Sequence, residues 1–244
     1  MKPTITQLLS KGEYFGRLLA IGQPFEGTGF FILYAVTGRS LSSRSRRLVH
    51  KTGGIFVEPL SEAAISDGRR ELLIYPAVLF GRGVAAGNGQ HTTSIAQTLA
   101  QGKSDPLDVL KRALEGWDYE PDAPTFTPRI SACVTIDGRL AMSSVSKSQE
   151  GQSQRDFFPL KLFPGRGFLL ATYQGLNTNP PPPFSGPPWE FFTPSSRPQD
   201  LLLEFHQALA PKKGKDDLRV ATIALTFSRP DQEPDWVEII NCSS

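Results

Sequence analysis

Short segments rich in apolar and β-branched residues, separated by glycine-containing breaks, most constrain how this chain can fold. Such segments are typical of β-strands, because branched and aromatic side chains pack well on a pleated surface. They predict about eight strands, at residues 14–21, 30–36, 71–80, 129–136, 140–145, 167–173, 219–227 and 236–240. Between two of these, Asp137-Gly138 predicts a two-residue hairpin loop, since both positions tolerate a positive φ.

Three helices are expected between the strands. The segment 105–115 begins with a cap residue, Asp105, followed by a proline at the first helical position, and its leucines fall three or four residues apart. A second helix begins near Ser196 with a capping-box pattern and ends before Pro211. A third covers 91–101. Runs of strands with helices in separate groups predict an α+β fold, a sandwich of sheets covered by helices, rather than alternating βαβ units.

The composition predicts a soluble globular protein with one large domain spanning residues 1–244. Hydrophobic residues make up 39% of the chain, enough for a core, and the net charge of +2 is too small for a surface built around nucleic acid. Two cysteines and three scattered histidines form no metal-spaced motif and favour a reducing, cytoplasmic setting. No segment has the length and hydropathy of a signal-peptide core or a membrane span. We therefore expect no metal site, no nucleic-acid partner and no membrane.

Two short clusters concentrate the reactive side chains. Residues 87–92, Gly-Asn-Gly-Gln-His-Thr, precede a predicted helix, so their amides favour an anion or a developing oxyanion. A tight turn with an ordinary capping residue is the alternative. Residues 117–122 precede Thr127-Pro128-Arg129, and a carboxylate beside a phenol and an arginine can relay protons. The alternative here is a helix-to-strand connection closed by salt bridges.

A basic loop, residues 38–47, follows a predicted strand and contains four arginines and four serines. Arginine forks pair bidentately with phosphate oxygens, and hydroxyls add short hydrogen bonds, so this loop suits a phosphate. A solvated basic loop is the alternative. RNA contact is less favoured, because the loop lacks the aromatic residues on which bases stack.

The segment 179–189 interrupts the strand pattern with polyproline character. We expect an extended surface insertion there. A ligand for a proline-binding domain is the alternative, and it rests on composition alone.

Five motifs occur in a characteristic order along the first half of the chain: residues 14–22 (YFGRLLAIG), Gly38-Arg39-Ser40 with Arg44, residues 88–92 (NGQHT), Asp118-Tyr119-Glu120, and Thr127-Pro128-Arg129-Ile130. In this order they resemble the archaeal-type inosine monophosphate (IMP) cyclohydrolase family. The resemblance covers residues 14–132, thins to 171–174, and leaves the polyproline segment and the C-terminus unmatched. Ser42 stands where the family commonly has proline, and Thr93 stands where an acidic residue can occur.

The resemblance implies a four-layer α-β-β-α sandwich of the N-terminal-nucleophile-hydrolase-like kind, without an N-terminal nucleophile. It also implies closure of 5-formamidoimidazole-4-carboxamide ribotide to IMP with loss of water, the last step of purine synthesis, by a homo-oligomer that needs no cofactor. In that reaction the carboxamide nitrogen attacks the formyl carbon. The enzyme must therefore orient both groups, stabilise an oxygen that becomes anionic, and move protons.

Roles for individual residues follow from the same resemblance. It places Arg39 and Arg44, assisted by Ser40, on the substrate phosphate, with Arg17 as a further candidate. Asn88 polarises the formamide or carboxamide oxygen. The residues that orient the base and shuttle protons are Tyr75, Asp118, Tyr119, Glu120 and Arg129, and the other substrate-binding residues are Gly89, His91, Thr92, Thr127 and Tyr173. For Tyr75 a structural role is the alternative, because a tyrosine in a strand is structural at least as often as catalytic.

Two other functions are compatible with the sequence. A non-catalytic or substrate-divergent homologue would bind a purine ribotide without turnover, and the divergent C-terminal third motivates it. An interaction module that uses residues 180–188 is motivated by composition only.

Overall fold

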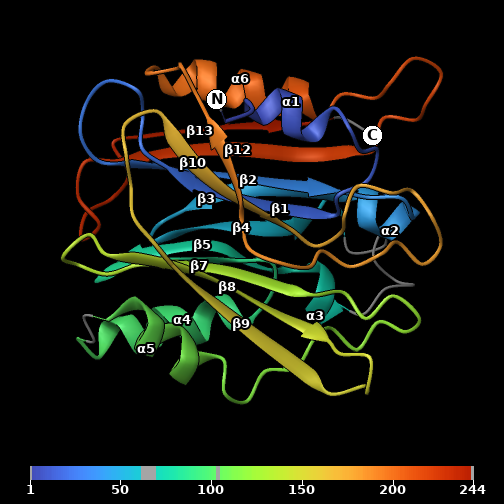
Figure 1. The fold of residues 1–244 in the computed structure, drawn as a ribbon, viewed down its shortest axis with the longest axis horizontal. Coiled ribbons are helices and arrows are strands. Elements are labelled where there is room, and N and C mark those ends of the chain that lie inside the picture. Colours follow the sequence, from blue (N-terminus) through green and yellow to red (C-terminus); the bar gives the residue numbers. More distant parts are fainter. Residues whose placement is uncertain (1, 62–69, 103–104, 243–244) are drawn as a thin grey trace.

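The computed structural model describes residues 2–61, 70–102 and 105–242. Its strands form two antiparallel sheets that lie face to face (Figure 1). The first sheet has the order β11-β10-β1-β2-β12-β13, with bounds Trp189–Phe192, Arg166–Ala171, Arg17–Gly22, Phe30–Thr37, Arg219–Phe227 and Trp236–Asn241. The second has the order β3-β4-β5-β6-β7-β8-β9, with bounds Arg46–Lys51, Gly54–Pro59, Tyr75–Gly81, Gly83–Gly87, Arg129–Val134, Leu140–Lys147 and Ser153–Leu160.

Helices cover the outer face of each sheet, so that the layers follow the order α-β-β-α (Figure 1). The first sheet is covered by α1 (Ile5–Leu9) and α6 (Pro198–Ala208), and the second by α4 (His91–Ala100) and α5 (Pro106–Ala113). Two short helices, α2 (Leu41–Arg44) and α3 (Arg70–Leu73), lie at one end of the sheets, on the right of Figure 1. The predicted α+β class, with two sheets and separate groups of helices, is confirmed. No helix in the described part of the chain is long and apolar enough to cross a membrane.

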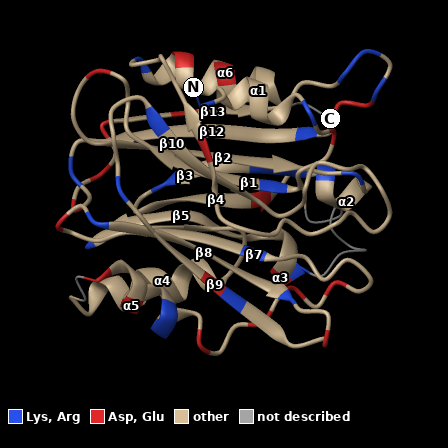
Figure 2. Ribbon diagram, viewed as in Figure 1, with Lys and Arg blue, Asp and Glu red and all other residues tan. Residues whose placement is uncertain are grey.

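The main hydrophobic core lies between the two sheets. Strands β1 and β2 are buried along their whole length, because other strands flank them, the second sheet lies on one face and helices lie on the other. A smaller cluster, which includes Ile95, Leu110 and Cys133, lies between the second sheet and α4 and α5. Figure 2 shows charged residues gathered in loops and on helices and sparse along the central strands. A charged residue buried among these strands therefore requires an explanation.

Five strands were missed by the sequence prediction: β3, β4, β6, β9 and β11. Strands β3 and β9 carry several charged residues and form the two edges of the second sheet. Strand β6 consists of Gly-Val-Ala-Ala-Gly, which has low intrinsic strand propensity. Packing against neighbouring strands decides the structure at such positions, so composition alone does not identify them.

Local predictions near the helix and hairpin ends need three corrections. The predicted strand 71–80 was wrong at its start, because Glu71 lies in α3, whose residues are good helix formers, and β5 begins only at Tyr75. The hairpin between β7 and β8 is confirmed, but its loop is longer than two residues and only Gly138 has a positive φ, 80°. The capping box at Ser196 was wrong, because the Ser196 hydroxyl accepts a hydrogen bond from the amide of Glu26 at 2.9 Å instead of capping α6.

Helix α5 begins as predicted. The Asp105 carboxylate accepts hydrogen bonds from the amides of Leu107 and Asp108 at 2.8 and 3.1 Å. The predicted helix 105–115 is confirmed, although α5 ends two residues earlier, at Ala113. The helix predicted at 91–101 is confirmed as α4.

The polyproline segment packs against the end of β10. Within 179–189, Pro181 and Phe184 are buried, and the amide of Phe184 donates to the carbonyl of Thr172 at 3.0 Å. The Phe184 ring meets the Trp189 ring edge-on at 4.8 Å. These contacts place the segment beside Tyr173, one of the residues of the site described next.

Candidate active site

A cavity of about 740 Å³ opens where β1 and β3 begin and β2 and β10 end. Helices α2 and α3 lie at this end of the molecule (Figure 1). The volume is in the range of sites for small organic ligands. Its charged lining residues are Arg17, Arg39, Arg46, Glu120 and Asp122.

A buried ion pair in this cavity joins the first sheet to the loop that precedes β7 of the second. Arg17, the first residue of β1, donates from Nη2 to both carboxylate oxygens of Glu120 at 2.7 Å. Glu120 lies in the loop between α5 and β7, and both residues are less than a tenth exposed. Burial raises the pKa of the Glu120 carboxyl, while the guanidinium groups of Arg17 and Arg129 oppose that rise. Burial lowers the pKa of Arg17, but the Glu120 carboxylate and the nearby tyrosines together outweigh burial, so the pKa of Arg17 lies well above its ordinary value.

The side chain of Asn88 fixes the position of Glu120. Its Nδ2 donates to Glu120 Oε1 at 3.3 Å and to the carbonyl of Pro128 at 3.0 Å, and its Oδ1 accepts from the amide of Ile130 at 2.7 Å. Asn88 is fully buried between β6 and β7. All the polar atoms of its side chain are thus engaged in fixing Glu120 and the start of β7.

Two pairs of tyrosines surround the ion pair. The hydroxyls of Tyr34 in β2 and Tyr75 in β5 lie 2.9 Å apart in the core between the sheets. The rings of Tyr14 and Tyr173 stack with centroids 5.3 Å apart and line the cavity. The hydroxyl of Tyr173 lies 2.6 Å from Thr127 Oγ1. Burial raises the pKa of both Tyr34 and Tyr173, so both stay protonated and available as hydrogen-bond donors.

Asp122 ties Tyr173 to the loop that carries Glu120. Its carboxylate accepts from the Thr127 amide at 2.7 Å and from Thr127 Oγ1 at 2.5 Å. The amide of Glu120 in turn donates to the carbonyl of Thr127 at 2.9 Å. These bonds fold the loop so that Glu120 and Asp122 both line the cavity.

The arginines of the basic loop point in different directions. Arg39 lines the cavity, where its guanidinium lies 4.5 Å from the centre of the Tyr14 ring and donates to the carbonyl of Thr178 at 2.5 Å. Arg44 instead donates to the carbonyl of Asp217 at 2.5 Å and does not line the cavity. Ser40 lies beside Arg39 at the N-cap of α2. The structure therefore brings Arg39 and Ser40 to the cavity and leaves Arg44 outside it.

His91 and Arg129 lie behind the cavity. His91 is fully buried, and its Nε2 donates to the carbonyl of Ile130 at 3.2 Å. Burial and the Arg129 guanidinium lower the pKa of His91 to about 3, so it is neutral at physiological pH. Arg129 packs over the Trp117 ring at 4.8 Å. Neither residue lines the cavity.

The turn that precedes α4 is packed closely around Gly89. A Cβ at Gly89 would lie 2.7 Å from Nη1 of Arg129 and 3.1 Å from Nδ1 of His91. Thr92 is buried and its hydroxyl donates to the carbonyl of Gly89 at 2.9 Å. Gln90 is the N-cap of α4 and makes no side-chain cap bond. Residues 87–92 therefore form a tight turn that fixes Asn88, and neither His91 nor Thr92 caps the helix.

Asp118 and Tyr119 point away from the cavity. The Asp118 carboxylate accepts from Ser153 Oγ at 2.8 Å and is largely exposed. The hydroxyl of Tyr119 donates to the carbonyl of Gly151 at 3.1 Å. The structure places both side chains against the turn between β8 and β9, whereas the neighbouring Glu120 turns inwards.

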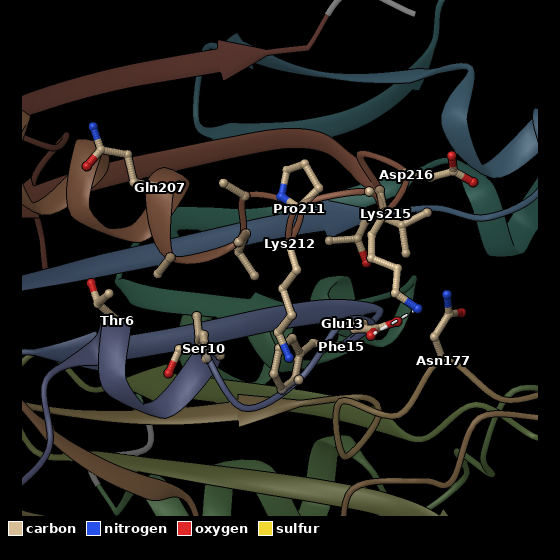
Figure 3. A pocket seen from close by; sticks show the side chains of 18 residues that line it. Thr6, Ser10, Glu13, Phe15, Asn177, Gln207, Pro211, Lys212, Lys215 and Asp216 are labelled. Atoms are coloured by element: carbon tan, nitrogen blue, oxygen red, sulfur yellow. Dashed lines mark ion pairs between the residues drawn. The ribbon is translucent and has the colours of Figure 1, made fainter.

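A second cavity, of about 350 Å³, lies between α1, the end of α6 and the loop 211–218 (Figure 3). Phe15 and apolar residues of α1 and α6 line it, and Lys215 pairs with Glu13 at 3.4 Å across its rim. Its four charged lining residues are all exposed. Desolvation combined with a specific charge partner marks functional sites more often than exposed charge does. The first cavity, with its buried ion pair, is therefore the candidate active site.

Sequence reasoning gave no individual role to four residues of the site, Tyr14, Tyr34, Arg46 and Asp122, although all but Tyr34 lie in motifs or clusters that it singled out. Arg46 is the first residue of β3, 2% exposed, and lines the cavity. Its burial follows the alternation along β3, in which Arg46 and Leu48 are buried and Arg47 is exposed. In the sequence Arg46 and Arg47 are identical neighbours, so their different burial can be expected only once the segment is taken as a strand.

The described residues hold no group of three or more His, Cys, Asp or Glu side chains that could bind a metal ion. Those that line the cavity, Glu120 and Asp122, are engaged with Arg17 and Thr127.

Comparison with known proteins adds two findings. A family model described as IMP cyclohydrolase-like protein matches residues 14–191, a range that contains every residue lining the candidate site. The chain is 31% identical over 162 residues to the IMP cyclohydrolase of Methanocaldococcus jannaschii, and this alignment covers 66% of the chain and 73% of that protein.

Proposed function

The chain belongs to the IMP cyclohydrolase-like family, and from this we propose that it closes 5-formamidoimidazole-4-carboxamide ribotide to IMP with release of water. The observation that carries the assignment to this cavity is the buried Arg17–Glu120 pair. It provides a proton carrier and a cation side by side, which ring closure with dehydration requires. A cavity of about 740 Å³ also accommodates a ligand of mononucleotide size.

Orientation supplies much of the catalysis in this proposal. Both reacting groups belong to one substrate, so holding the carboxamide nitrogen against the formyl carbon brings the reaction close to its transition state. The stacked rings of Tyr14 and Tyr173 offer the base a flat apolar wall. The tie from Tyr173 through Thr127 to Asp122 keeps that wall rigid.

Glu120 is the proposed proton carrier. As the carboxamide nitrogen attacks, Glu120 accepts its proton and passes it to the oxyanion, which becomes a hydroxyl. The former formamide nitrogen then gives up its proton to Glu120 as the ring C=N bond forms, and Glu120 returns that proton to the hydroxyl, whose C–O bond breaks to release water. The burial-raised pKa of Glu120 brings it closer to neutral pH, where a carboxyl exchanges protons most effectively. Asn88 keeps the carboxylate in position by its hydrogen bond to Oε1.

Arg17 stabilises the oxygen that becomes anionic during the attack. Its Nη2 is engaged with Glu120, but its buried Nε has no hydrogen-bond partner within residues 2–61, 70–102 and 105–242. A formyl oxygen placed at this nitrogen would satisfy it and gain a charge-assisted hydrogen bond. Tyr75 lies close enough to act electrostatically on Arg17, and its hydroxyl is fixed by Tyr34.

Arg39 and Ser40 are proposed to bind the substrate phosphate at the other end of the cavity. For the residues outside the cavity we propose positioning roles. They comprise Asp118, Tyr119, Arg129, Gly89, His91 and Thr92, which fix the loops that carry Glu120 and Asn88. Arg44 would act by holding loop 211–218 against the basic loop.

Three further features complete the proposal: the fold and domain organisation, the cellular setting and the oligomeric state. The α-β-β-α layer order supports an N-terminal-nucleophile-hydrolase-like fold for one domain covering residues 1–244. Both cysteines are free, which supports a reducing, cytoplasmic setting. Both sheets are open and end in edge strands, which supports assembly into a homo-oligomer, and light scattering of the purified protein measures that directly.

The first test is turnover of the formylated ribotide by the purified protein, followed by absorbance with no added metal or cofactor. The unformylated carboxamide ribotide, which cannot cyclise without a formyl group, is the matched control and should give binding without product. Formation of IMP from the formylated ribotide supports the proposal. Saturable binding of both compounds without product would favour a non-catalytic ribotide-binding homologue.

A further inference from the structure

Arg46 is a buried cation with no carboxylate partner among the residues that the structure describes. Its Nε donates to the carbonyl of Ser43 at 2.8 Å. Its Nη1 is buried and has no hydrogen-bond partner in the described part of the chain. A guanidinium carries five donors, so this side chain keeps unused donor capacity inside the protein.

The surroundings of Arg46 make this arrangement costly in the free protein. Among the side chains that act electrostatically on it, Arg17 is a cation, so its charge has the same sign as that of Arg46. Burial and Arg17 both lower the pKa of Arg46, while nearby tyrosines oppose the shift. Buried charges in proteins are normally paired or bound to a ligand, because a buried charge loses its hydration and needs another interaction in its place. Since Arg46 lines the cavity, a bound ligand is the available source of compensation.

Arg39 adds a second positive charge to the same cavity. Its partners among the described residues are neutral: the Tyr14 ring, the Asn177 amide oxygen and the carbonyl of Thr178. Arg17, by contrast, is neutralised by Glu120. The cavity therefore holds two guanidinium groups, those of Arg39 and Arg46, that pair with no carboxylate of the described residues. A phosphomonoester carries about −1.5 to −2 charge at neutral pH. The hydroxyls of the basic loop that line the cavity, on Ser40, Ser42 and Ser43, suit the same group.

We propose that Arg46, together with Arg39, binds the phosphate of the ribotide, and that Arg46 supplies the second guanidinium that Arg44 does not. This inference rests on the proposed function for the identity of the ligand, but it concerns binding and can be tested without turnover. Arg44 is occupied by the carbonyl of Asp217 outside the cavity. The subsite is specific for a dianionic group, so it should distinguish a nucleotide from its nucleoside.

The test compares the binding of IMP and of inosine, which lacks the phosphate, to wild-type protein and to Arg46→Met. Methionine keeps much of the length of the side chain and removes the charge. The matched control is Arg47→Met, because Arg47 is the next residue of β3 and is exposed. Arg46→Met should weaken IMP binding by about 10- to 100-fold, the range for hydrogen bonds to charged groups. The affinity of Arg46→Met for inosine should stay within about twofold of the wild-type value. Arg47→Met should bind both IMP and inosine as the wild type does.

Thermal unfolding separates this role from a structural one. If Arg46 serves the ligand, Arg46→Met should unfold at the same or a higher temperature than the wild type without ligand, because an uncompensated buried cation has been removed. It should also lose most of the stabilisation that IMP gives to the wild type. Arg46→Lys, which keeps the charge without the planar fork, should recover part of that stabilisation.

Equal weakening of IMP and inosine in Arg46→Met, or unchanged binding of both, would overturn the proposal. So would marked destabilisation of the free Arg46→Met protein together with recovery of stability in Arg46→Lys. Failure of the proposed function has a different signature: the wild type binds IMP in an Arg46-dependent manner but forms no IMP from the formylated ribotide.

Discussion

At the scale of single residues, burial decides which of several similar side chains is functional. The basic loop and β3 supply Arg39, Arg44, Arg46 and Arg47, and only Arg39 and Arg46 line the cavity. Glu120 is buried, while its neighbours Asp118 and Tyr119 point to another turn. Residue type and spacing identified the correct stretches of sequence. They could not tell which members of each stretch turn inwards, because that depends on strands and loops packing from elsewhere in the chain.

His91 gives a residue-scale prediction about pH. Its pKa is lowered to about 3 in the folded protein, compared with about 6.5 in an unfolded chain. Between these values the unfolded state binds one more proton than the folded state, so the free energy of unfolding rises with pH. The stability is complete above the unfolded pKa and is lost as pH falls towards 3, with a slope of up to about 1.4 kcal/mol per pH unit.

Urea unfolding of the wild type and of His91→Asn, at pH 7.0 and pH 5.0, measures this effect. The loss of stability between these pH values should be smaller in His91→Asn than in the wild type. His50→Asn is the matched control, because His50 is an exposed residue of β3, and it should behave as the wild type does. An unchanged pH dependence in His91→Asn would show that another group carries the effect.

At the scale of elements, the site depends on contacts between strands of different sheets. Arg17 begins β1 in the first sheet, and Glu120 lies 103 residues away in the loop before β7 of the second. Composition and hydrophobic patterning predicted the strand that contains Arg17, and the helix and strand on either side of the loop that contains Glu120. The pairing itself follows from the face-to-face packing of two sheets, which no local pattern specifies. The charged edge strand β3 was missed because packing against other strands, and not its own composition, decides its structure. The burial of Arg46 at its start was missed with it.

The hydrogen bond between Tyr34 and Tyr75 gives an element-scale prediction, because it joins β2 of the first sheet to β5 of the second. Replacing either tyrosine with phenylalanine removes the same bond and leaves the other buried hydroxyl unpaired, at a cost of about 1 to 3 kcal/mol. The double replacement should cost less than the sum of the two single ones, since no hydroxyl is left unpaired.

Denaturant unfolding of Tyr34→Phe, Tyr75→Phe and the double variant checks this. Strict additivity would mean that the two hydroxyls do not share one hydrogen bond. Turnover of the same variants separates the two roles considered for Tyr75. A catalytic or orienting role requires Tyr75→Phe to lower the rate more than Tyr34→Phe, whereas equal rates would leave Tyr75 with a structural role only.

At the scale of the whole molecule, the α+β class and the separate grouping of helices were predictable from segment lengths and periodicity. The order of the strands was not, because β10 and β12 pair with β1 and β2 from more than a hundred residues away. This topology leaves the cavity at the end where strands of both sheets begin or end, and it leaves the second cavity on the far side of the first sheet (Figures 1 and 3).

The central claim is that a carboxyl buried between the two sheets moves the protons of ring closure. The most direct test is the turnover of the formylated ribotide by Glu120→Gln, which keeps the shape of the side chain and removes its ability to accept a proton. The control is Glu115→Gln, since Glu115 is exposed and lies in the same loop between α5 and β7. We predict that Glu120→Gln lowers the rate about 10²- to 10⁴-fold while still binding IMP, and that Glu115→Gln retains the wild-type rate. Wild-type turnover by Glu120→Gln would contradict the account.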